Sequence, residues 1–182
     1  FRVPTTFRNG ILTIDFQPEY NSVYFAYFAP YSYERHLDLI HETQLFDNVS
    51  MEVVGQTFEG RDIEMLRVGK PGKNKKVIWV IARQHPGESM AEWFIEGMLS
   101  RLLDEDDPVS RTLLKEAVFY VVPNMNIDGS IAGNLRSSAS GANLNREWQR
   151  PTKKYSPEVF YVRNKMDETG MNLILDIHGD EE

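Results

Sequence analysis

The sequence predicts an α/β fold with a central mixed, largely parallel sheet flanked by helices. Continuous apolar runs rich in β-branched residues occur at 76–83, 117–124 and 172–179. Such runs are typical of strands that are buried on both faces. Segments with apolar residues at helical spacing separate the three runs. Strands that alternate with helices along a chain form a largely parallel sheet.

The first thirty residues have a different pattern and predict strands. Residues 10–16 alternate apolar and polar side chains, and residues 22–30 are rich in aromatic and β-branched residues. Asn9-Gly10 is a turn signal before the first of these segments. Because the region is too short for a domain, we expect residues 1–30 to be the C-terminal part of an N-terminal β module, the end of a small β-sandwich.

A helix and a strand pair follow the β-rich start. Residues 32–45 have helical spacing, and their two histidines, His36 and His41, are expected to be solvated on a surface helix. Residues 51–69 read as two strands around a turn at Glu59-Gly60. The basic segment 70–76 contains proline and glycine and predicts a solvated hairpin turn.

Three more helices are expected between and after the buried strands. Residues 87–106 place a set of apolar side chains three and four positions apart, which predicts one buried helical face: Met90, Trp93, Phe94, Met98, Leu99 and Leu102. A second helix is expected at 110–116. Ser156 and Pro157 form a start signal for a third helix, which Gly170 can end.

Composition excludes several classes of function. The net charge of −7 and the pI of about 5.2 argue against a nucleic-acid partner, which a basic face would accompany. The chain has no cysteine, so disulfides, thiolate metal sites and cysteine nucleophiles are excluded. No apolar run approaches the roughly 18–20 residues that span a bilayer, and no signal-peptide pattern is present. We therefore expect no membrane partner.

Polar side chains at the ends of buried strands indicate a metal site. His85 and Glu88 follow the strand at 76–83, and His178 closes the strand at 172–178. Chemistry gathers at the carboxyl ends of strands in such sheets, and two imidazoles with one carboxylate are a common catalytic zinc set. A Pro86-Gly87 turn would let both side chains of the first pair aim at one point. Taken singly, each residue also suits a structural role, as a hydrogen-bonded histidine or a helix N-terminal glutamate.

Three short motifs in a fixed order carry a family resemblance. QHPGE at 84–88, NLNREW at 143–148 and DIHGDE at 176–181 resemble those of zinc metallocarboxypeptidases. The chain is most similar to the cytosolic carboxypeptidase-like branch, which includes tubulin deglutamylases and bacterial relatives, and we expect a bacterial member. The resemblance covers nearly the whole chain. It implies that residues 31–182 are the N-terminal portion of a zinc carboxypeptidase catalytic domain.

The resemblance also implies roles for individual residues. The implied zinc ligands are His85, Glu88 and His178, with one Zn²⁺ per catalytic domain, and the implied substrate residues are Arg136, Asn145 and Arg146. Arg136 would stabilise the oxyanion on the scissile carbonyl, while Asn145 and Arg146 would hold the substrate's terminal carboxylate. Guanidinium groups suit both tasks, because they pair with carboxylates in two-point contacts and carry a permanent charge.

Two features depart from the family pattern. Asn143 stands where the family has an aspartate that accepts a hydrogen bond from a zinc-binding histidine. Its amide oxygen can still accept that bond, without the charge. In the family the general-base glutamate lies well downstream, so it is not in this chain, which we expect to be one piece of a longer or cleaved protein. We assign the role of general base to neither Glu181 nor Glu182.

The expected function is zinc-dependent hydrolysis of the C-terminal peptide bond of peptides or proteins, with acidic residues as a candidate specificity. An aspartoacylase-like zinc amidohydrolase of N-acyl amino acids is one alternative, because it uses a similar ligand set on the same general fold. A catalytically incomplete module that only binds C-terminal tails is the other. The branch implies a cytoplasmic location. The oligomeric state, the residue removed and the physiological substrate do not follow from the sequence.

Overall fold

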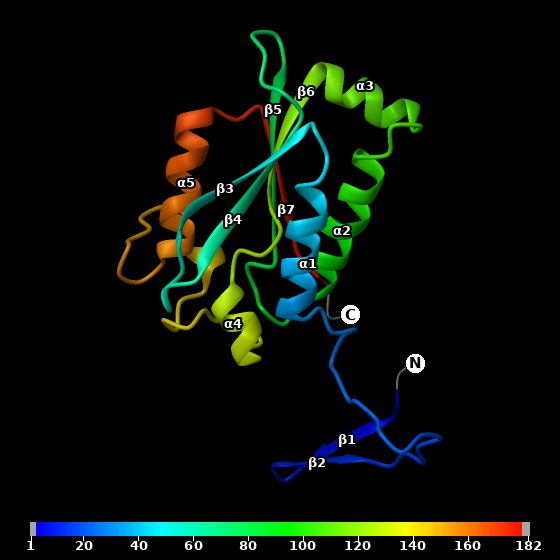
Figure 1. The fold of residues 1–182 in the computed structure, drawn as a ribbon. Coiled ribbons are helices and arrows are strands. Elements are labelled where there is room, and N and C mark those ends of the chain that lie inside the picture. Colours follow the sequence, from blue (N-terminus) through cyan, green and yellow to red (C-terminus); the bar gives the residue numbers. More distant parts are fainter. Residues whose placement is uncertain (1–2, 180–182) are drawn as a thin grey trace.

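The computed structural model of the chain, described here for residues 3–179, contains a five-stranded mixed sheet with helices on both faces (Figure 1). Its strands, in the order β3-β4-β6-β5-β7, are β3 (Val49–Gln56), β4 (Asp62–Val68), β6 (Ala117–Val122), β5 (Lys76–Ala82) and β7 (Leu173–Ile177). β4 is antiparallel to β3 and to β6, whereas β5 is parallel to both β6 and β7. Of the five strands only β4 is reversed, so the predicted largely parallel sheet is confirmed.

Helices cover the two faces of the sheet. α1 (Tyr33–Thr43), α2 (Met90–Leu102) and α3 (Pro108–Glu116) lie on one side in Figure 1, and α5 (Pro157–Thr169) lies on the other. Two short elements that the sequence did not predict, α4 (Ile127–Ala132) and the 3₁₀ helix η1 (Leu144–Arg146), follow β6. Among the helices of residues 3–179, none has both the length and the apolarity needed to cross a bilayer.

Strict alternation in the central strands explains their continuous apolar sequence. In β5, Ile78, Val80 and Ala82 pack in the cluster that contains α1 and α2, while Trp79 and Ile81 pack in the cluster that contains α5. β6 divides its side chains between the same two clusters. A strand with both faces buried has no polar positions left, which is why no period of two is visible in its sequence.

The N-terminal region differs from its prediction. β1 (Thr5–Arg8) and β2 (Ile11–Ile14) form a hairpin, and its turn contains Asn9 and Gly10 with φ of 52° and 79°. The predicted strand at 22–30 is wrong, because this segment is irregular and its aromatic side chains are largely exposed. Figure 1 shows the hairpin apart from the main sheet, joined to α1 by an extended segment. The domain boundary near residue 30 stays a prediction.

One further expectation is wrong for a topological reason, and another is met only in part for an electrostatic one. Residues 70–76 do not form a hairpin turn, because β6 lies between β4 and β5 and the segment is a crossover. In α2, Leu99 and Leu102 are buried as predicted, but the buried face also contains Ala91, Glu92 and Ile95, while Trp93 and Phe94 are exposed. Because the buried side includes a charged residue, Glu92, a search for apolar spacing does not identify the correct face.

Candidate metal centre

The candidate site lies at the carboxyl ends of two neighbouring parallel strands. β5 ends at Ala82, which is paired with Ile177 at the end of β7. His178 follows β7 directly, and His85 and Glu88 lie between β5 and α2. The structure brings these three side chains together, with one possible ligand atom from each within 4.8 Å of the others. The expectation that strand ends converge on one point is therefore confirmed.

The turn between His85 and Glu88 is held by close backbone packing. The Gly87 N–H donates to the Leu135 carbonyl at 2.9 Å. A Cβ atom on Gly87 would lie 2.8 Å from Leu135 Cδ1 and 2.9 Å from its carbonyl oxygen, so only glycine fits this approach. A Cβ on Gly129 would likewise lie 2.6 Å from Pro86 Cγ. The turn thus fixes the relative positions of the His85 and Glu88 side chains and of the segment that carries Arg136.

Glu88 joins the two histidines. Its Oε1 lies 2.8 Å from His85 Nδ1, its Oε2 lies 2.8 Å from His178 Nδ1, and Gly179 N–H donates to Oε2 at 3.1 Å. Burial raises the pKa of Glu88, but the hydrogen bonds from Gly179 and the histidines outweigh burial and lower it. The carboxyl group is therefore held in its charged form, as a metal ligand requires.

The far ring nitrogen of each histidine has its own acceptor. His85 Nε2 lies 3.2 Å from Asn143 Oδ1, as expected for an asparagine that replaces aspartate here. His178 Nε2 lies 3.0 Å from Asp176 Oδ2. With Nε2 engaged in this way, both rings direct Nδ1 to the inside of the cluster. Two imidazole nitrogens and a buried carboxylate are a donor set that fits zinc.

The predicted substrate residues lie around this cluster. The side-chain amide of Asn145, in η1, lies 3.3 Å from His178 Nε2. Arg146 is exposed, and its guanidinium donates to the Asn145 carbonyl at 3.1 Å. Arg136 is exposed and follows Leu135, the residue that contacts Gly87. Exposed guanidinium groups such as these can bind anionic groups of a substrate. Glu181 and Glu182 lie outside the described residues.

A buried polar network behind the turn escaped the sequence prediction. Arg83 has a φ of 54°, and its guanidinium donates to the carbonyls of Pro86 at 2.8 Å and Tyr31 at 3.0 Å. It also pairs with Glu92, which is fully buried in α2. Because Arg83 donates to a carbonyl of the turn, the network stabilises the loop that contains His85. Neither a left-handed backbone nor a buried ion pair leaves a signal in residue spacing.

His36 belongs to the same network, so its expected solvation is wrong. The ring is 1% exposed, and its Nδ1 lies 2.8 Å from Glu92 Oε1. Burial lowers the pKa of His36, but hydrogen bonds and charge interactions with Glu64 and Glu92 outweigh burial and raise the pKa to about 9. The ring is thus charged at neutral pH. His41, on the same helix, is exposed as expected.

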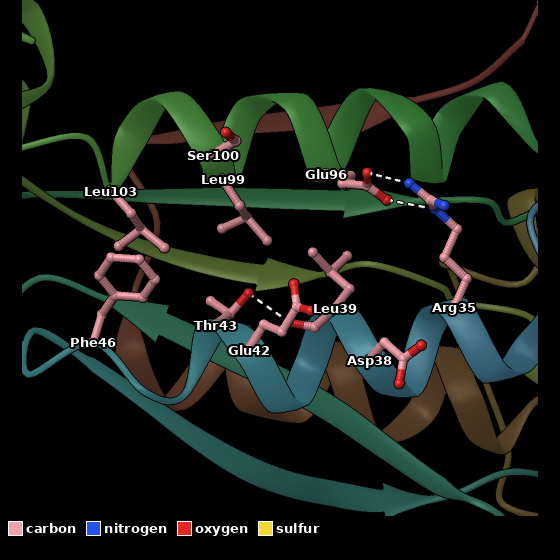
Figure 2. Close-up of a pocket in the computed structure, with 10 residues that line it drawn as sticks. All are labelled: Arg35, Asp38, Leu39, Glu42, Thr43, Phe46, Glu96, Leu99, Ser100 and Leu103. Atoms are coloured by element: carbon pink, nitrogen blue, oxygen red, sulfur yellow. Dashed lines mark hydrogen bonds and ion pairs between the residues drawn. The ribbon is translucent and has the colours of Figure 1, made fainter.

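A separate groove between α1 and α2 has a volume of about 410 Å³ (Figure 2). Figure 2 shows Arg35 paired with Glu96 at one end, where the two contacts measure 2.8 and 2.6 Å, and Phe46 at the other. None of the residues that line the groove belongs to the histidine–glutamate cluster. The candidate functional site is therefore the cluster at the strand ends.

Comparison with known proteins agrees with this site. A metallo-carboxypeptidase from Burkholderia cenocepacia superposes with a TM-score of 0.94 at 51% identity, over 100% of this chain and 50% of that one. A Pseudomonas aeruginosa metallo-carboxypeptidase gives 0.94 at 48% identity, over 100% and 48%. Mouse cytosolic carboxypeptidase 6 is 31% identical over 98% of this chain and 36% of its own length.

The chain thus spans half or less of each of these relatives. The sequence profile of the zinc carboxypeptidases matches residues 34–182, which is most of the chain. Zinc is the cofactor that this family implies, and the donor set of the cluster fits it. The ordered motifs, the strand-end cluster and the profile agree, and the chain belongs to the zinc carboxypeptidase family.

Proposed function

We propose that the chain contributes the zinc ligands and substrate-binding residues of a carboxypeptidase that hydrolyses the last peptide bond of peptides or proteins. The observation that carries the proposal is the convergence of His85, Glu88 and His178 within 4.8 Å, from segments far apart in the sequence. Both rings direct Nδ1 into the cluster, so each presents one ring nitrogen to a bound ion. A bound zinc ion would activate water and polarise the scissile carbonyl.

Arg146 and Asn145 are the proposed anchor for the substrate's terminal carboxylate. Arg146 is exposed, so its guanidinium is available for a two-point contact with a carboxylate. The neighbouring Asn145 amide lies 3.3 Å from a ring nitrogen of His178, so an anchored substrate end would lie beside the metal ligands. The Pseudomonas aeruginosa relative was solved in complex with (2-guanidinoethylmercapto)succinic acid, whose name specifies a dicarboxylic acid, and this agrees with a carboxylate-binding site.

Arg136 is the proposed group that stabilises the negative charge on the carbonyl oxygen. Its neighbour Leu135 accepts a hydrogen bond from Gly87, which lies between two of the proposed ligands. This backbone hydrogen bond therefore positions Arg136 next to the turn between His85 and Glu88. A permanent cation held next to the reacting carbonyl favours the transition state, where the oxygen gains charge.

Removal of acidic residues is the finer part of the proposal. Its support is the similarity to cytosolic carboxypeptidases. The net charge of −7 works against attraction of acidic tails at long range, so the preference would depend on local cations beside the bound side chain. The cytoplasmic location likewise stays a prediction.

The test is amino-acid release from peptides that differ in the C-terminal residue, read by mass spectrometry with zinc and with chelator. Because the relatives are longer, both the 182-residue chain and the product of its whole gene are assayed. Zinc-dependent loss of single C-terminal residues supports the proposal. Zinc binding without release from any peptide contradicts it, and turnover of N-acyl amino acids would then favour the amidohydrolase over a module that only binds tails.

A further inference from the structure

A chain of hydrogen bonds connects the NLNREW segment to His178. Trp148 Nε1–H donates to Gln84 Oε1 at 2.8 Å, and Gln84 Nε2–H donates to Asp176 Oδ2 at 2.7 Å. The same Asp176 oxygen lies 3.0 Å from His178 Nε2. Gln84 is 0% exposed, and its backbone carbonyl accepts from the Asn126 side chain at 2.9 Å. The side-chain amide of Gln84 is therefore held at both its oxygen and its nitrogen, and the backbone that carries it is also bonded.

The directions of the first two bonds in this chain follow from its first member. An indole N–H can only donate, so the oxygen of the Gln84 amide must face Trp148 and its NH₂ must face Asp176. Asp176 accepts this bond as a carboxylate, and His178 Nε2 donates the second bond to the same oxygen. The proton of His178 is thus kept on Nε2. Its Nδ1 faces Glu88 Oε2 inside the cluster at 2.8 Å and would be the nitrogen that binds a metal there.

The two proposed histidine ligands differ in the charge of their partner. His85 Nε2 faces the neutral amide oxygen of Asn143, while His178 Nε2 faces a carboxylate. A carboxylate behind a metal-binding histidine orients the ring and makes it a stronger donor. His85 therefore has a neutral partner, and the charged partner lies at the other histidine, His178.

We propose that Asp176 is the positioning carboxylate of the metal centre, and that Gln84, held by Trp148, keeps it aimed at His178. The inference rests on the proposed zinc site. It adds three residues that act through His178 and do not themselves contact the metal. It also makes the segment of Arg146 a structural support of a metal ligand, because Trp148 lies two residues further along the same segment.

The test is the zinc Kd of the apo chain, measured in competition with a chelating dye. Asp176→Asn keeps the shape of the side chain and removes its charge, and we expect zinc binding to weaken by about 10- to 100-fold. Asp167→Asn, at an exposed site on α5, is the matched control and should bind like the parent chain. Trp148→Phe breaks the chain at its start and should weaken binding by about 3- to 10-fold.

Rescue separates a positioning role from a merely structural one. Asn143→Asp restores a charged partner at His85, so adding it to Asp176→Asn should recover about 10-fold in affinity. Thermal unfolding of the apo variants shows that each still folds. If Asp176→Asn binds zinc as tightly as the parent chain, the inference is overturned. If the parent chain binds no zinc, or binds it equally well after His85→Ala, the proposed zinc site itself fails.

Discussion

Replacement of His36 by glutamine tests whether a charged imidazole is stabilised inside the core. The ring is 1% exposed between Glu92 and Glu64, and its pKa is raised from 6.5 to about 9. Since the pKa is higher in the folded chain than in the unfolded chain, folding takes up a proton between these two values. The stabilisation is fully present below about pH 6.5 and is lost as the pH rises through about 9. The difference between the two pKa values corresponds to about 3 kcal/mol.

The assay is urea unfolding of the parent chain, His36→Gln and His41→Gln at a series of pH values from about 6 to about 9.5. The free energy of unfolding of the parent chain, minus that of His36→Gln, should fall by about 3 kcal/mol across this range. His41→Gln is the matched control on the same helix, and should follow the parent chain because His41 is exposed. Parallel curves for the parent chain and His36→Gln would refute the reasoning.

Three further substitutions probe the turn, the network behind it and the proposed anchor. Gly87→Ala would press a Cβ against the Leu135 backbone and should lower the free energy of unfolding by about 1–3 kcal/mol, measured by urea unfolding. Gly97→Ala is the control, because Gly97 lies on a helix with open space around it. This change should raise the free energy of unfolding by up to about 1 kcal/mol in the same assay. Arg83→Met removes one of the two cations that pair with the buried Glu92, the other being His36, and should cost about 3–5 kcal/mol by urea unfolding. A cost below about 1 kcal/mol would contradict the assigned ion pair. Arg146→Lys keeps the charge but loses the two-point contact, so steady-state kinetics should show a KM raised by about 10-fold with a smaller change in kcat, and an unchanged KM would exclude it as the anchor.

Much of the sheet and most helices could be predicted because their signals are local. The runs that became β5, β6 and β7 are apolar on both faces, and Gly170 ends α5 as predicted. The failures involve information that lies elsewhere in the chain. The segment at 70–76 has the local sequence of a hairpin turn, but β6, which comes later in the chain, lies between its flanking strands β4 and β5. The buried face of α2 includes Glu92, which only a partner on another element makes tolerable.

The sequence predicts the three side chains that converge in the candidate site but not the residues that support them. His85, Glu88 and His178 follow from strand ends and from the ordered motifs, and the structure brings them together. Gln84 and Asp176 flank these ligands in the sequence, yet their hydrogen bond joins residues 92 positions apart. Such a contact depends on the register of β5 against β7. A single sequence contains no direct record of that register.

The distance along the chain between Glu88 and His178 has a consequence for folding. The two residues are 90 positions apart, and their side chains meet only after β7 has joined β5. An ion held by both would close a loop of this length, as a covalent crosslink does, and a crosslink of that span restricts the unfolded chain by about 4–5 kcal/mol in the chain-entropy treatment. Metal retention would then report the integrity of the whole central sheet, and opening of β7 alone would be enough to release the ion.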